Sequence, residues 1–171
     1  DNIYGLLLHR PEQLLGLDGP KIYRSLESLK EKGLVEKIGV SISSPKELDV
    51  LIPNFRFDLV QAPLNLIDRR LINTGWMKRL KDAGVEIHTR SSFLQGLLLI
   101  KQAEIPSKFL QWNGLWKQWH HWLLDSNISA LQASLSFSLS FPEIDQVIVG
   151  VNSPDQLLEI ISASRNTLKN N

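Results

Sequence analysis

Residues 38–47 read I-G-V-S-I-S-S-P-K-E and hold one complete step from a buried strand into a helix. The first four residues form a short run without polar alternation, which is typical of a parallel strand covered on both faces. Ser44 is followed three positions later by Glu47, the spacing of a capping box, and Pro45 stands at the preferred first helical position. The stretch therefore predicts a βα unit, in which a parallel strand leads directly into a helix.

The same step recurs on either side of this stretch. Further strands are expected at the short apolar runs 3–8, 57–61, 85–89 and 147–149. Five parallel strands are too few for a closed (β/α)8 barrel, which needs eight units and typically about 250 residues. The pattern fits either an open α/β sheet or the later part of a barrel whose opening strands lie upstream.

Helices are expected between these strands. Apolar positions at helical spacing from Ile22 to Leu29 predict a helix that ends at Gly33. Residues 68–83 predict another helix, which ends at Gly84. The sequence S-P-D-Q at 153–156 is a second capping box and predicts the start of the final helix.

The composition excludes several classes of protein. The 171 residues carry 19 Lys+Arg against 18 Asp+Glu, a formal net charge of +1, which argues against an electrostatic nucleic-acid binder. The absence of cysteine excludes disulfides, thiolate zinc sites and a cysteine nucleophile. No apolar run approaches the roughly 20 residues of a membrane span, and no secretory signal opens the chain, so we expect a cytoplasmic location. The start at Asp1, with Met77 as the one methionine, favours a truncated piece of a longer product.

The segment before the last strand is rich in tryptophan. Trp112, Trp116, Trp119 and Leu123 share one helical face, which could be an aromatic platform for a ligand or a face packed on the core. Packing is the favoured interpretation. The adjacent histidines at 120–121 point in different directions on a helix, so a metal site there is not expected.

Polar residues follow the predicted strands at the end where ligands gather in parallel α/β proteins. The set is mostly uncharged, which suits a ligand with amide, carbonyl and phosphate groups better than a metal ion. The chain has no G-x-x-x-x-G-K-[ST] loop and no G-x-G-x-x-G after a strand. The set comprises His9, Ser41, Gln61, Asn65, Arg90, Ser91, Gly150, Asn152 and Ser153.

Five short motifs together resemble one family. L-L-H-R-P at 7–11, I-G-V-S at 38–41, V-Q-A-P-L-N at 60–65, S-S-F-L-Q-G-L-L at 91–98 and V-G-V-N-S-P-D-Q-L at 149–157 are similar, in order and spacing, to the segments of the fourth to eighth strands of aldo-keto reductases. The resemblance implies a partial (β/α)8 TIM barrel that holds strands 4 to 8 with their helices and lacks the first three βα units. Residues 1–171 would then be a single incomplete barrel domain, with a helical insertion at 101–141 between the seventh and eighth strands.

The resemblance also implies an activity, the transfer of a hydride from NADP(H) or NAD(H) to a small-molecule aldehyde or ketone. His9 would orient the substrate carbonyl by a hydrogen bond to its oxygen. Ser41 and Gln61 would hold the carboxamide of the nicotinamide. The remaining cofactor positions would be Arg90 beside the nicotinamide, Ser91, Gly96 and Leu97 along the pyrophosphate, and Gly150, Asn152, Ser153 and Gln156 around the adenosine phosphate.

Some of these residues have a purely structural alternative, and some depart from the family's pattern. Ser153 and Gln156 are equally explained by the capping box, and Gly150 by the turn between strand and helix. Ile42 stands where the family often has Asn, and Arg90 where many members stack an aromatic ring on the nicotinamide. Because Ser153 replaces a frequent basic partner of the 2′-phosphate, a preference for NADP over NAD is not supported.

The family's catalytic Asp, Tyr and Lys come from strands that precede the His9 strand. Tyr4 and Tyr23 are the only tyrosines, and neither is expected to be the proton donor. We therefore expect negligible reductase activity from this polypeptide alone. Two other hypotheses remain: a non-catalytic half-barrel that binds a nucleotide or a partner, and a homodimer that covers the exposed edges of the sheet.

Overall fold

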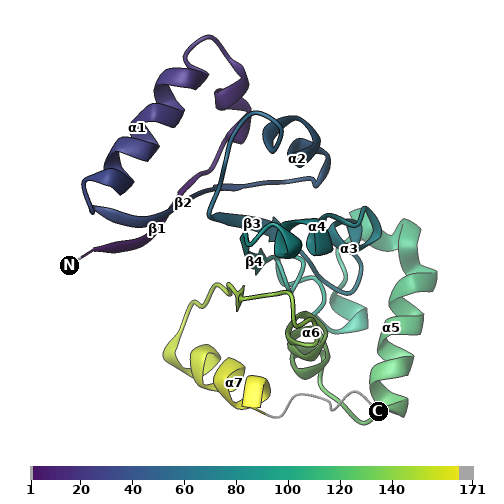
Figure 1. The fold of residues 1–171 in the computed structure, drawn as a ribbon. Helices are drawn as coiled ribbons and strands as arrows, with labels where there is room; N and C mark the ends of the chain where they lie inside the picture. The colour runs from purple at the N-terminus through teal and green to yellow at the C-terminus, as the bar shows by residue number, and fades with distance from the viewer. Residues whose placement is uncertain (1, 166–171) are drawn as a thin grey trace.

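The computed structural model describes residues 2–165 as a single parallel sheet with helices around it (Figure 1). The sheet order follows the chain, and every pair of neighbouring strands is parallel. This confirms the predicted parallel α/β architecture. The strands are β1 (Ile3–Leu8), β2 (Val35–Ser41), β3 (Leu59–Pro63), β4 (Glu86–Arg90) and β5 (Gln146–Val147).

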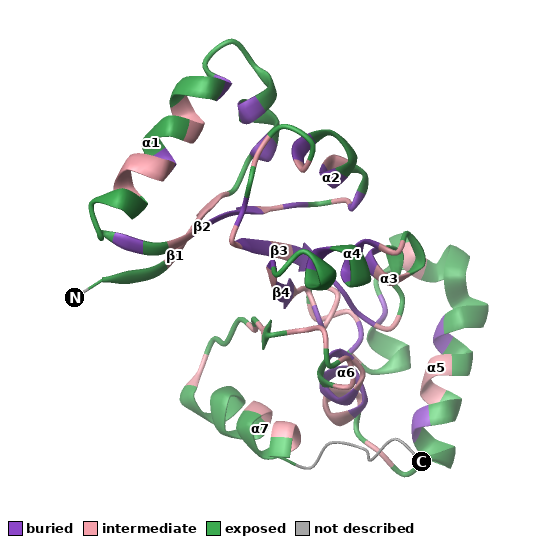
Figure 2. Ribbon diagram, viewed as in Figure 1, coloured by how far each residue is buried: buried purple, intermediate pink, exposed green. Residues whose placement is uncertain are grey.

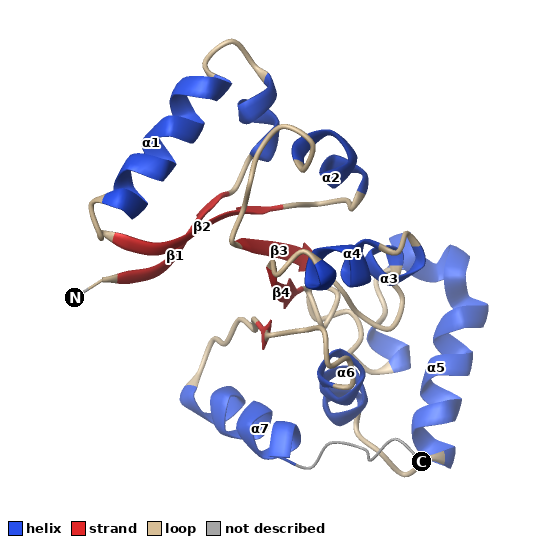
Figure 3. Cartoon of the chain, viewed as in Figure 1, coloured by secondary structure: helices blue, strands red, loops and turns tan. Residues whose placement is uncertain are grey.

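Helices connect successive strands, as parallel pairing requires (Figure 3). The helices between β4 and β5 all lie within residues 101–141. The α-helices are α1 (Gly19–Glu31), α2 (Lys46–Leu51), α3 (Arg70–Asn73), α4 (Trp76–Asp82), α5 (Asn113–Asp125), α6 (Ala130–Leu139) and α7 (Pro154–Arg165), and the 3-10 helices are η1 (Pro11–Leu15), η2 (Gln102–Glu104) and η3 (Ser107–Trp112).

Several predicted boundaries were wrong: β2 begins at Val35 instead of Ile38, and β4 covers Glu86–Arg90 instead of 85–89. The expected helix over 68–83 is divided into α3 and α4, because Gly75 adopts a left-handed conformation with φ of 75° between them. β3 begins two residues later than predicted, because Asp58 forms two hydrogen bonds with Ile38. The Asp58 N–H donates to Ile38 O at 2.9 Å, and the Asp58 carboxylate accepts a hydrogen bond from Ile38 N at 3.0 Å. The last strand is reduced to two residues at the edge of the sheet.

The two predicted capping boxes form to different degrees. At α7, Ser153 Oγ accepts Gln156 N at 3.2 Å, and Gln156 Oε1 accepts Asn152 N at 2.9 Å, so both halves of the motif are made. At α2, Glu47 Oε1 accepts Ser44 N at 2.7 Å, but no side chain caps the start of the helix. The capping box at the start of α2 is therefore only half made.

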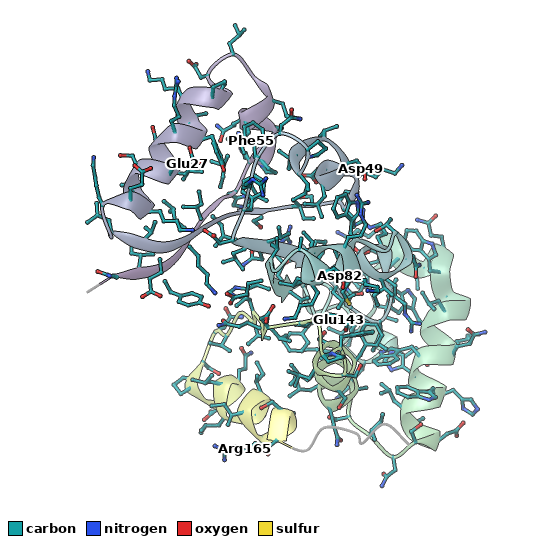
Figure 4. The ribbon with its side chains drawn as sticks, viewed as in Figure 1. Glu27, Asp49, Phe55, Asp82, Glu143 and Arg165 are labelled. Carbon is teal, nitrogen blue, oxygen red and sulfur yellow. The ribbon has the colours of Figure 1, made fainter. Side chains whose placement is uncertain are left out.

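The main hydrophobic core lies between the outer face of the sheet and its helices (Figure 2). Val40, Val60 and Ile87 are completely buried on three adjacent strands. Asp49 of α2, labelled in Figure 4, accepts a hydrogen bond from Trp76 Nε1 of α4 at 2.9 Å and joins these two covering helices. Residues one position away in each strand, such as Ser41 and Gln61, must therefore point to the inner face.

The backbones of β2 and β3 approach closely at Gly39. A Cβ atom at this position would lie 2.0 Å from Leu59 O, whereas 3.4–4 Å is an ordinary contact. Gly39 pairs with Leu59 in the register of the two strands, and Ser41 pairs with Gln61 two residues further along. The absence of a side chain at Gly39 therefore sets the distance between the two strands just below the polar strand ends.

Candidate functional site

One cavity of about 310 Å³ lies at the carboxyl ends of β1 to β4. Leu7, His9, Ser41, Gln61 and Arg90 line it. Four of these five residues were predicted as site residues from separate motifs, and the parallel register now brings them together. A larger hollow of about 420 Å³ follows the exposed face of α1. It lies away from the strand ends, and none of the predicted site residues lines it.

Ser41 and Gln61 form a hydrogen-bonded pair on this cavity. Ser41 Oγ donates to Gln61 Oε1 at 3.0 Å, which fixes the orientation of both side chains. The Gln61 amide nitrogen remains a donor, and the Ser41 oxygen remains an acceptor. A neighbouring donor and acceptor of this kind are complementary to a carboxamide, which itself offers one carbonyl oxygen and one NH2 group. The donor set thus fits the carboxamide of a nicotinamide.

Arg90 reaches from the end of β4 across the mouth of the cavity. Its Nη2 donates to Ile42 O, just beyond β2, at 3.1 Å, and its Nη1 donates to Ser91 Oγ at 3.2 Å. Both acceptors are uncharged. Among residues 2–165, no carboxylate forms an ion pair with Arg90. The guanidinium therefore gives the cavity a fixed positive charge, since arginine remains protonated in proteins.

Asn65 holds the loops beside the cavity and does not line it. Its side chain is buried, with Nδ2 donating to Ser91 O at 3.0 Å. Its Oδ1 accepts Ile67 N at 2.9 Å and Asp68 N at 2.8 Å. Ser91 itself has a φ of 63°, which is uncommon for a residue with a side chain. Asn65 is thus a positioning residue that fixes the loop carrying Ser91.

The other predicted cofactor residues do not line this cavity. Gly96 lies in the turn after β4 with a φ of 84°, and Leu97 follows it in the same turn. Gly150 lies between β5 and α7 and has open space where a Cβ would project. Ser153 and Gln156 are engaged in the capping box of α7, with Asn152 as the backbone donor. The structural alternative therefore accounts for the contacts of this second group.

A second polar cluster lies on the same inner face, at the amino ends of the strands. Tyr4 donates to the Glu86 carboxylate at 2.7 and 2.8 Å, and Lys37 donates to Tyr4 Oη at 2.8 Å. Lys37 also forms an ion pair with Glu86, whose Oε1 lies 2.7 Å from His88 Nε2. This cluster was not predicted from the sequence, although the alternation 37, 39, 41 and 86, 88, 90 already placed Lys37, Glu86 and His88 on the face of Ser41 and Arg90.

These contacts change the acidity of the cluster. Burial alone would raise the pKa of Glu86, but the hydrogen bonds from Lys37, Tyr4 and His88 outweigh it and lower the pKa to about 2. The same bond to Glu86 raises the pKa of Lys37. Tyr4 lies five residues before His9, a separation of roughly 16 Å along an extended strand. The cluster is therefore a neutralised ion-pair network at the opposite end of the sheet from His9.

Two tryptophans of the tryptophan-rich segment pack on the protein, as the favoured interpretation predicts. Trp116 is buried, and its Nε1 donates to Phe109 O at 3.0 Å. Trp119 donates to Leu98 O at 3.2 Å, while Trp112 lies before α5 and is half-exposed.

Within residues 2–165, no group of three or more His, Asp or Glu side chains could hold a metal ion. No helix in the described part of the chain is long and apolar enough to cross a membrane.

A parallel sheet with polar side chains around one cavity at its strand ends defines an α/β protein of the barrel or open-sheet class. The model of the aldo/keto reductase family matches residues 2–171, and the chain belongs to this family. A search of curated proteins finds no match.

Solved structures show the same fold. The aldo-keto reductase AKR11C1 from Bacillus halodurans matches in its apo and holo forms, each with a TM-score of 0.72 and 20% identity over 98% of this chain. The thermostable aldo-keto reductase Tm1743, solved with the inhibitor epalrestat, matches with a TM-score of 0.70 and 19% identity over 99% of this chain. The chain spans only 57–58% of the length of these proteins. The predicted partial (β/α)8 barrel is thus confirmed.

Proposed function

We propose that this chain is the nicotinamide-binding part of an NAD(P)-dependent aldo-keto reductase that reduces an aldehyde or a ketone. Membership of the family supports an oxidoreductase. The observation that carries the proposal is the single cavity on which His9, Ser41, Gln61 and Arg90 meet. In this proposal, His9 and the Ser41–Gln61 pair act on different ligands in adjoining parts of the same cavity.

Gln61, Ser41 and His9 line the cavity, and each would have a separate role. Gln61 donates to the carboxamide oxygen of the cofactor, and Ser41 accepts from the carboxamide nitrogen. His9 donates a hydrogen bond to the carbonyl oxygen of the substrate, where negative charge grows during reduction. The bound nicotinamide would supply the hydride.

General acid catalysis requires a further group. The present sequence offers Tyr4 and Tyr23, but Tyr4 lies in the ion-pair network at the far end of the sheet. Tyr23 belongs to α1, and its Oη donates to Arg56 O at 2.8 Å. We therefore propose that this chain binds the cofactor and does not by itself reduce a carbonyl compound. Gly96, Leu97, Gly150, Asn152, Ser153 and Gln156 are retained as proposed contacts of the phosphates.

Cofactor binding can be measured directly by titrating NADH and NADPH and following their fluorescence. Gln61→Ala removes the donor to the carboxamide and should weaken cofactor binding about tenfold, because one hydrogen bond between uncharged groups is lost. Gln118→Ala, on the exposed face of α5, is the matched control and should leave affinity unchanged. Failure of both dinucleotides to bind would contradict the proposal.

Catalysis requires a separate assay, the steady-state oxidation of NADH or NADPH with a reactive aldehyde. We expect no turnover above the rate without protein. Turnover close to that of an intact member of the family would show that the chain contains its own proton donor. His9→Ala would then reveal whether the activity arises at this cavity.

The edges of the sheet favour a second candidate, in which the half-barrel associates with a partner or with a second copy. Ile3 on the edge strand β1 is 57% exposed, and Leu158 on α7 is 64% exposed. β1 and β5 stand at the two ends of the strand order and each pairs on one side only among the described residues. Light scattering would detect a dimer, and a monomer at all concentrations would refute self-association.

A further inference from the structure

The unusual electrostatic feature of the cavity is the position of Arg90. β3 lies between β2 and β4 in the sheet, yet the Arg90 side chain from β4 bonds to Ile42 O next to β2. The side chain therefore passes over the end of β3, the strand that carries Gln61. Its second bond, to Ser91 Oγ, holds the guanidinium in this place. The fixed charge consequently lies beside the Ser41–Gln61 pair.

In the described part of the chain, no carboxylate pairs with this charge. Lys37, on the same inner face, has Glu86 as a partner, and Arg70 has Asp68 at 2.7 Å. Arg90 donates to a backbone carbonyl and a hydroxyl, and among residues 2–165 no acidic side chain lines the cavity. A ligand placed here therefore experiences an uncompensated positive potential.

We propose that Arg90 makes the cavity discriminate between the two oxidation states of a nicotinamide cofactor, favouring the uncharged reduced ring over the cationic oxidised ring. This inference rests on the proposed function, because it requires the ring to occupy the cavity beside Ser41 and Gln61. The oxidised ring carries one positive charge, and the reduced ring carries none. Repulsion from Arg90 therefore acts on the oxidised form only and weakens its binding relative to the reduced form.

The two forms of one dinucleotide provide an internal control. NAD+ and NADH carry the same two phosphates, so any attraction between Arg90 and a phosphate affects both equally and cancels in the ratio of their dissociation constants. The ratio thus isolates the charge on the ring. We expect the wild-type chain to bind NADH about tenfold more tightly than NAD+, an order-of-magnitude figure for two like charges in a partly solvated cavity.

The test is isothermal titration of NADH, NAD+ and ADP-ribose into the wild-type chain, Arg90→Gln and Arg90→Lys. Arg90→Gln removes the charge and keeps a donor, so the ratio should fall close to one. Arg90→Lys retains the charge and should retain most of the ratio. ADP-ribose has the phosphates without the ring, and its affinity should change little in Arg90→Gln. Thermal unfolding of each variant verifies that it is folded.

The possible results separate the two proposals. If wild type binds both dinucleotides and Arg90→Gln leaves their ratio unchanged, the discrimination by Arg90 is refuted while cofactor binding stands. If Arg90→Gln weakens NADH, NAD+ and ADP-ribose by the same factor, Arg90 contacts a phosphate, and the inference is likewise refuted. If wild type binds neither dinucleotide, the proposed function and this inference both fail.

Discussion

Gly39→Ala should strongly destabilise the protein, because the new methyl group would lie 2.0 Å from the carbonyl oxygen of Leu59. The two strands must separate by about 1 Å to bring this contact to even 3.0 Å. Overpacking of this kind costs about 1–3 kcal/mol, and weakened ladder bonds next to it add about 1 kcal/mol each. These neighbouring bonds include Asp58 N to Ile38 O at 2.9 Å and Ile42 N to Gln61 O at 2.9 Å.

We therefore expect a loss of about 3 kcal/mol in the free energy of unfolding and a melting temperature lower by roughly 10 °C. Urea unfolding followed by circular dichroism measures the first quantity, and a thermal scan measures the second. Since Ser41 lies two residues further along β2, cofactor affinity should fall as well. Gly114→Ala is the matched control: nothing lies within 4 Å of its added Cβ in α5, and alanine favours a helix. A Gly39→Ala protein within about 0.5 kcal/mol of wild type would refute the close approach of β2 and β3.

Three further changes test other parts of the structure. The pKa of Glu86 lies at about 2 in the folded protein against 4.5 ordinarily, so its stabilising effect is fully present above about pH 4.5 and is lost as the pH falls toward 2. Unfolding measured across this range should show a loss of up to about 3 kcal/mol in wild type and a flatter profile in Glu86→Gln. Asn65→Ala removes three hydrogen bonds from a buried side chain and should lower the free energy of unfolding in urea by about 3 kcal/mol. The control Asn54→Ala loses one exposed hydrogen bond and should lower it by under about 1 kcal/mol. Equal effects of the two variants would argue against the positioning role of Asn65. Trp116→Ala should cost about 3–5 kcal/mol, and Trp122→Ala, at a half-exposed position, much less; the reverse order would mean that the other face of α5 is packed.

Local sequence patterns predicted the architecture because they report on burial and chain reversal, which are short-range properties. The apolar run at Ile3–Leu8 became β1 with the expected bounds, and Gly33 ended the first helix with a φ of 68°. The capping box at Ser153 formed in full. Polar residues after parallel strands converged for a general reason, since the carboxyl ends of such strands meet at one edge of the sheet.

The same patterns failed where the outcome depended on contacts distant in sequence. The apolar run at 57–61 could not reveal that Asp58 would bond to Ile38 before β3 begins, and Asn65 gave no sign that it would bond to Ser91, 26 positions away, instead of lining the cavity. Sequence alone could not join Tyr4 to Glu86, which lies 82 positions away.

The sequence by itself determined the order of strands and helices, the family and the residues that stand at the strand ends. Only the tertiary structure decided which of them share the cavity and which charges have partners. Lys37 and Arg90 are both cations on the inner face, but strand register places Glu86 beside Lys37 and only uncharged acceptors beside Arg90. A neutralised charge stabilises the fold, whereas an uncompensated one acts on whatever binds, and that difference depends on three-dimensional distances that no local pattern encodes.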